Sequence, residues 1–103
     1  MEGGKPLVRS YELMFIVDPE VEGEAFDAVT ERVKELIERQ EGQIIHVDLW
    51  GTRPLAYPIR KKREGQYVVM QFELASPSQG IAHLERDLLL VEPIMRHLIV
   101  RNE

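Results

Sequence analysis

The segment Gly51–Gly65 reads GTRPLAYPIRKKREG and lies in the middle of a 103-residue chain. It carries five of the thirteen basic residues, two prolines and a single acid near its end. Alternating apolar stretches flank it on both sides, as expected for two strands that pair as a hairpin. Charged residues are costly to bury without partners, so this segment is unsuited to a hydrophobic core. It is well suited to binding a polyanion, and we interpret the rest of the chain as a scaffold that presents this basic loop.

A strand is predicted on each side of the loop. The preceding strand, Gln43–Thr52, has two faces, which carry Ile45, Val47 and Leu49 on one side and Ile44, His46, Asp48 and Trp50 on the other. A β-bulge would reverse part of this alternation. The following strand, Gln66–Leu74, directs one set of residues toward the core (Val68, Met70, Phe72 and Leu74) and another set away from it (Tyr67, Val69, Gln71 and Glu73).

Two helices and two further strands are predicted outside this hairpin. Tyr11–Val17 alternates as a strand and ends before Asp18-Pro19, because proline cannot donate a ladder hydrogen bond. Val21–Gln40 has apolar residues at helical spacing and acids near its start, which favours a helix. A second helix is expected to begin at Ser76-Pro77 and to run to about Leu89. Ile94–Val100 is the last predicted strand.

This β-α-β-β-α-β order predicts an α+β protein with a ferredoxin-like fold. Two βαβ halves joined by the hairpin form a four-stranded antiparallel sheet, with both helices on one face. Right-handed crossovers place the first and third strands in the centre and the second and fourth at the edges. We expect residues 1–103 to form a single domain, in which residues 1–8 are a flexible tail.

The predicted sheet leaves one face without helices, and that face is apolar. It carries Met14, Ile16, Tyr67 and Val69, together with Ile44 and Trp50 if no bulge intervenes. Soluble monomers rarely expose so large an apolar patch, which makes Met14, Ile16, Trp50, Tyr67 and Val69 a candidate surface for a partner protein. Alternatively, they are strand-forming residues that long neighbouring side chains cover.

The distribution of charge matters more than its total. The formal net charge of −5 argues, taken alone, against nucleic-acid binding. From Asp18 to Glu41, however, there are nine acids and three bases, whereas Leu49–Arg63 contains five bases and no acid. The chain is therefore predicted to have one acidic flank, which is either a solvated helix face or a surface for a basic partner, and one basic edge.

No catalytic or metal site is predicted. The chain has no Cys, and its three His fall on different predicted elements without a second ligand at metal spacing. The loop Asp18–Glu24 is acidic where a phosphatase of this topology would hold phosphate. The apolar run Leu13–Val17 is too short to cross a membrane, and no signal peptide is recognisable. We expect a cytoplasmic, non-enzymatic protein without cofactor, metal or small-molecule substrate.

The basic loop suits recognition of RNA through phosphates and shape. RNA-recognition motifs of this topology stack bases on aromatic residues of the third strand, where this chain directs only Tyr67 outward. The predicted RNA-binding residues are Arg53, Tyr57, Arg60, Lys61, Lys62 and Arg63, with Arg96 and Arg101 on the last strand as an extension. Tyr57 either stacks on a nucleotide or anchors the loop to the scaffold. A run of four bases is also typical of a soluble hairpin tip.

The run Arg53–Ile59, RPLAYPI, followed by basic residues and Gly65, resembles the signature of a bacterial ribosomal protein family. This is the family of the sixth protein of the small (30S) subunit. The resemblance extends from about Arg9 to Arg101 and includes the first strand. It lends support to Arg53, Tyr57, Arg60 and Lys61 in particular. Pro54 stands where a second basic residue is common in the family, so one phosphate contact is expected to be absent.

The resemblance implies a ferredoxin-like fold, no enzymatic activity and a place on the ribosome. It also implies binding to the central domain of 16S rRNA, and pairing with a small basic partner, the eighteenth protein of the same subunit. A rival interpretation is a ligand-sensing or homo-oligomeric ferredoxin-like domain without RNA binding, in which the basic loop only maintains solubility.

Overall fold

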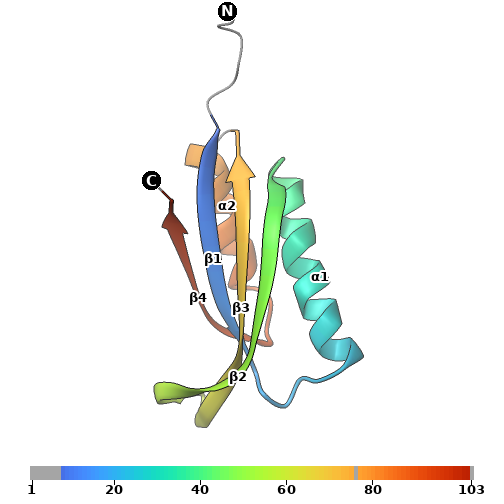
Figure 1. Ribbon diagram of the computed structural model, residues 1–103, viewed down its shortest axis with the longest axis vertical. Helices are drawn as coiled ribbons and strands as arrows, with labels where there is room; N and C mark the ends of the chain where they lie inside the picture. Colours follow the sequence, from blue (N-terminus) through green and yellow to red (C-terminus); the bar gives the residue numbers. More distant parts are fainter. Residues whose placement is uncertain (1–7, 76, 103) are drawn as a thin grey trace, which may run out of the picture.

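The computed structural model describes residues 8–75 and 77–102 and contains six elements (Figure 1). They are β1 (Arg9–Val17), α1 (Glu24–Arg39), β2 (Gln43–Ile59), β3 (Lys62–Leu74), α2 (Pro77–Leu88) and β4 (Ile94–Arg101). The predicted helix cap Ser76 and residues 1–7 of the predicted tail lie outside the described residues. The order β-α-β-β-α-β agrees with the sequence-based prediction.

The four strands form one antiparallel sheet in the order β2-β3-β1-β4. The first and third strands therefore occupy the centre, as right-handed crossovers require. In Figure 1, α2 lies behind the strands and α1 runs alongside β2; both helices contribute to the same core, and the face of the sheet toward the viewer is free of helices. The fold is ferredoxin-like, as predicted.

The core lies between the sheet and the two helices. The predicted alternation is confirmed on β1, where Leu13, Phe15 and Val17 are fully buried. It is also confirmed on β3, whose inward residues Val68, Met70, Phe72 and Leu74 are fully buried. Helix α1 contributes Val33, Leu36 and Ile37, and α2 contributes Leu84 and Leu88. Helix α1 begins three residues later than predicted, at Glu24, because residues 18–21 form a turn closed by the Val21 amide and the Asp18 carbonyl, 3.0 Å apart.

The predicted faces of β2 are partly wrong, because the strand contains an irregularity near Ile45. The register shifts between Ile44 and His46, so that Ile44 lies opposite Phe72 and packs against the core. Ile45, which was expected to face inward, is 52% exposed. The extra residue reverses the direction of the residues before it. Val47 keeps its predicted inward position opposite Met70.

The predicted basic loop is a β-hairpin. Strand β2 continues to Ile59 and β3 begins at Lys62, so that only Arg60 and Lys61 lie between the strands. The prolines are tolerated because β2 is an edge strand, where a missing backbone donor costs little. Pairing resumes at Ile59 and Lys62 after Pro54 and Glu64, so that four residues (55–58) stand opposite Arg63 alone. Both strands are therefore longer than predicted, since the second was expected to end at Thr52 and the third to begin at Gln66.

Candidate functional site

The hairpin beyond the sheet, residues 52–65 (the hairpin arm), bends across the lower end of the molecule in Figure 1. Two glycines permit this bend. Gly51 has φ +81°, a left-handed conformation that side chains rarely adopt. A Cβ at Gly65 would overlap Ile16 Cγ2 and lie 3.0 Å from Met95 Cε. The arm therefore rests directly on β1 and β4 at Gly65.

The tip of the arm is a two-residue turn formed by two basic residues. Arg60 and Lys61 have φ values of 51° and 65° and connect the paired residues Ile59 and Lys62. Turns with positive φ at both central positions favour Asn and Gly, because the left-handed conformation costs other residues roughly 1 kcal/mol each. The chain thus has cations at a position where the backbone favours smaller residues.

Arg60 turns back from the tip toward the body of the protein. Its Nη1 and Nη2 donate hydrogen bonds to the carbonyl oxygens of Glu92 (2.7 Å) and Ile94 (3.1 Å). These carbonyls lie at the junction between α2 and β4, 32 and 34 residues away in sequence. The guanidinium therefore joins the tip of the arm to the beginning of β4.

Lys62 also contacts the body of the protein. Its Nζ donates to the Glu20 carboxylate and lies 3.8 Å from Asp18 Oδ1. The hydrogen bond to Glu20 is the main cause that raises the pKa of Lys62, and the charges of Asp18 and Glu20 add to it. Nearby, Gln66 Nε2 donates to the carbonyl oxygens of Asp18 (3.0 Å) and Val21 (2.6 Å). The arm is thereby connected to the β1–α1 loop.

Tyr57 and Arg96, both predicted to bind RNA, contact each other. Arg96 Nη1 donates to the Tyr57 hydroxyl, and the guanidinium carbon lies 5.4 Å from the ring centroid. Tyr57 nevertheless remains 54% exposed. This contact links β2 to β4 and corresponds to the anchoring role considered for Tyr57, while the exposed part of the ring is accessible for contact with a ligand.

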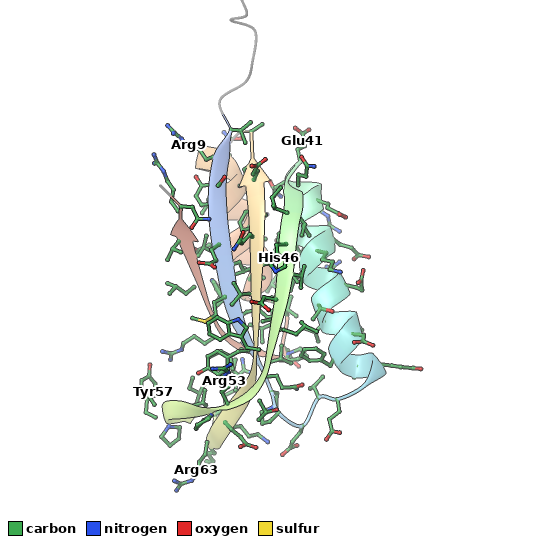
Figure 2. The ribbon with its side chains drawn as sticks, viewed as in Figure 1. Arg9, Glu41, His46, Arg53, Tyr57 and Arg63 are labelled. Carbon is green, nitrogen blue, oxygen red and sulfur yellow. The ribbon has the colours of Figure 1, made fainter. Side chains whose placement is uncertain are left out.

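Arg53 lies at the base of the arm on an aromatic stack. Its guanidinium carbon is 5.1 Å from the Trp50 ring centroid, and the Trp50 and Tyr67 rings stack with centroids 6.2 Å apart. Lys61 and Arg63 are exposed, and within residues 8–75 and 77–102 neither has a carboxylate at ion-pair distance. Figure 2 shows Arg53, Tyr57 and Arg63 together at the lower end of the molecule.

Arg101 does not join these residues. It lies opposite Tyr11 on β1, whereas Gln66, next to the arm, lies opposite Val17. Six residues along a strand separate the two ends by about 20 Å. Arg101 instead shares a shallow hollow with Arg9 at the far end of the sheet, where Figure 2 labels Arg9. The expected extension of the basic patch therefore includes Arg96, and not Arg101, because β4 runs away from the arm.

The helix-free face of the sheet carries an apolar groove. It is lined by Met14, Trp50 and Val69 from the predicted partner surface, and also by Glu12, Leu98 and Val100. Ile16 and Val69 are only 7% and 5% exposed, so the accessible apolar area comes mainly from Trp50, Leu98 and Val100. The sequence prediction missed Leu98 and Val100. Their alternation with Ile99, which packs against the core, was the signal that could have identified them.

The part of the chain that the structure describes contains no group of three His, Cys, Asp or Glu residues arranged to hold a metal ion. In the same residues, no helix has the length and apolar character needed to span a membrane.

Comparisons with known proteins agree on one family. The family model described as ribosomal protein S6 matches residues 10–101. The chain is 45% identical over 96 residues to small ribosomal subunit protein bS6 of Paenarthrobacter aurescens, and the match covers 93% of each chain. It is 43% identical over 95 residues to bS6 of Desulforamulus reducens, covering 92% of this chain and 98% of that protein. The crystal structure of 30S ribosomal protein S6 from Thermotoga maritima superposes with a TM-score of 0.86 at 36% identity, covering 93% of this chain and 89% of that chain.

Proposed function

The chain belongs to the ribosomal protein S6 family of the small subunit, and from this premise we propose that it is a structural component of the bacterial ribosome. In this proposal the hairpin arm binds the central domain of 16S rRNA. The helix-free face of the sheet docks the eighteenth protein of the small subunit. The role is architectural and not enzymatic, and its location is the cytoplasmic ribosome.

The concentration of positive charge on the arm is the observation that carries the RNA-binding proposal. In a chain of net charge −5, Gly51–Gly65 has five bases and one acid. Phosphate contacts by Lys and Arg release counterions, so log affinity falls with log salt by about 0.7–0.9 per contact. If all five cations of the arm contact phosphates, the slope is about −3.5 to −4.5.

Support for partner docking comes from the apolar groove and the charge of the chain. Trp50, Leu98 and Val100 are 41%, 55% and 42% exposed on one face. Glu12 lines the same groove and offers a carboxylate to a basic partner. An apolar groove that includes a carboxylate fits a small basic protein, because charge complementarity adds to the burial of apolar area.

RNA binding can be tested with a triple variant of the arm. Arg53→Gln, Lys61→Gln and Arg63→Gln together are expected to weaken binding to a central-domain rRNA fragment and to flatten the salt slope by about 2–2.7. The matched control changes Arg32, Lys34 and Arg39 of α1 to Gln, which removes the same charge from the acidic flank. Measurements are made with the partner protein present. If both triple variants lose the same RNA affinity and the same salt slope, only net charge matters, and the arm is not the RNA-binding site.

The exposed groove also favours a second candidate, in which the sheet face pairs with a second copy of the chain. Sedimentation of the purified protein separates the two functions. A stable homodimer that ignores both rRNA and the partner protein would support the second candidate, whereas a monomer that forms a heterodimer supports the ribosomal role.

A further inference from the structure

The four consecutive cations Arg60–Arg63 do not have equivalent surroundings. Arg60 and Lys62 make hydrogen bonds to the body of the protein, whereas Lys61 and Arg63 have no ion-pair partner among the described residues. The two engaged cations reach the body in different places, Arg60 at the junction between α2 and β4 and Lys62 at the β1–α1 loop.

Arg60 is held by two carbonyl oxygens in a geometry that uses both of its terminal nitrogens. The contacts to Glu92 and Ile94, at 2.7 and 3.1 Å, satisfy acceptors at the turn that leads into β4. These contacts use two of the five N–H donors of Arg60 and fix the orientation of its guanidinium against the body of the protein. Its position in the structure is therefore that of a brace between the tip and β4.

Lys62 is held on the other side of the arm by two carboxylates. Its side chain is 25% exposed and lies between Asp18 and Glu20 of the β1–α1 loop. The pKa of Lys62 is raised above its usual 10.5, so the pair stabilises the arm at neutral pH. On the alkaline side, this contribution is lost as the pH rises above 10.5 through the raised value. A phosphate that bound this ammonium group would have to displace the Asp18 and Glu20 carboxylates. It would also come close to two groups that repel it, because all three are anions.

We infer that Arg60 and Lys62 are positioning residues that clasp the arm against the α2–β4 and β1–α1 loops. The phosphate contacts of the arm are made by Arg53, Lys61 and Arg63. This inference rests on the proposed RNA-binding function and refines it, because it divides the cations by role. It also changes the expected number of phosphate contacts on the arm from five to three.

The clasp explains how an exposed hairpin can bind without a large entropic cost. A free hairpin loses backbone and side-chain freedom when it binds, which subtracts from affinity. The braces at Arg60 and Lys62 hold the arm before RNA arrives, so that the arm loses less freedom on binding. Removal of a brace should weaken RNA binding because the arm becomes more mobile. The number of neutralised phosphates should stay the same.

The test compares two neighbouring lysines. Lys61→Gln and Lys62→Gln remove the same charge from adjacent positions, and affinity for a central-domain rRNA fragment is measured with the partner present from about 50 to 200 mM salt. Lys61→Gln should reduce the slope of log affinity against log salt by about 0.7–0.9. Between the two salt concentrations, the fold loss of affinity should therefore be about three times larger for the unchanged protein than for the variant. Lys62→Gln should retain the slope. Equal slope losses would overturn the inference and leave the proposed function standing.

Amide hydrogen exchange without RNA provides a second, independent measurement. The double variant Lys62→Gln/Glu20→Gln removes the pair at constant net charge and should accelerate exchange in residues 52–65. The control pair Lys61→Gln/Glu22→Gln makes the same change in charge and should leave exchange of the arm unchanged. Equal exchange in both double variants would overturn the clasp. A failure of the unchanged protein to bind RNA, with or without its partner, would overturn the proposed function and the assignment of phosphate contacts, while exchange would still decide whether the clasp exists.

Discussion

Arg60 and Lys61 adopt a backbone conformation that side chains rarely adopt. Left-handed residues cost roughly 1 kcal/mol each relative to glycine, and such strain is often found where function requires a particular side chain. Lys61 makes no ion pair with the described residues, so no such contact offsets the free-energy cost of its left-handed backbone. The strain is consistent with a residue retained for contact with a ligand.

Lys61→Gly should therefore change stability and RNA affinity in opposite directions. Glycine relieves the left-handed strain, so the free energy of unfolding should increase by about 1 kcal/mol. The loss of the ammonium group should lower RNA affinity. Chemical denaturation and RNA titration measure the two effects. Lys61→Asn is the control, because Asn tolerates this conformation while still lacking the charge. A destabilised Lys61→Gly variant would contradict the geometry of the turn.

Among the strands, the alternation of apolar and polar residues was sufficient to predict which residues of β1 and β3 face the core, but it was insufficient for β2. Both central strands have one uninterrupted apolar face, which leaves a single register compatible with a buried core. Strand β2 lies at the edge, where apolar residues occur on both faces and Ile44 and Ile45 are adjacent. Local sequence could not distinguish which of them packs inward. Its prolines also concealed the continuation of the strand, because an edge strand accepts proline without losing a ladder bond.

The irregularity in β2 predicts unequal effects of two identical substitutions. Ile44→Asp places a carboxylate against the core opposite Phe72 and should cost about 2–4 kcal/mol of unfolding free energy. Ile45→Asp changes a residue that is 52% exposed and should cost less than about 1 kcal/mol. Urea denaturation measures both. A larger loss of stability for Ile45→Asp than for Ile44→Asp would instead support the regular alternation expected from the sequence.

The contacts of the arm could not be predicted from local sequence. Arg60–Arg63 were expected to act as one exposed basic run, because adjacent cations look alike in a sequence. Their division depends on contacts with residues 32–42 positions away, such as Glu92 and Glu20. The separation of Arg101 from the arm likewise depends on strand direction. The basic character of the site was evident from the sequence, and the arrangement of its cations required the fold.

At the scale of the whole molecule, different surfaces are suited to different partners. The arm, at the lower end of the sheet in Figure 1, concentrates positive charge, and α1 carries acidic residues along one flank. The apolar groove lies on the helix-free face. A protein organised in this way can contact RNA and a second protein simultaneously. Its affinity for RNA alone is expected to be weak at physiological salt, since few phosphates are neutralised.

Leu98→Glu should separate partner binding from folding. Leu98 is 55% exposed in the apolar groove, so a carboxylate there should weaken partner binding at least about tenfold while changing stability by less than about 1 kcal/mol. Leu89→Glu is the control, because Leu89 is 75% exposed after the end of α2 and does not line that groove. Isothermal calorimetry with the partner protein measures the difference. Equal losses for both variants would argue against docking on the sheet face.

Contact between the hairpin arm and rRNA can be detected by crosslinking combined with mass spectrometry. The protein, its partner and a central-domain rRNA fragment are assembled, irradiated and digested, and the peptides that carry nucleotides are identified. We predict crosslinks within residues 52–65, most of all at Lys61 and Arg63. Crosslinks confined to Arg9 and Arg101 at the far end of the sheet, or to α1, would contradict this prediction.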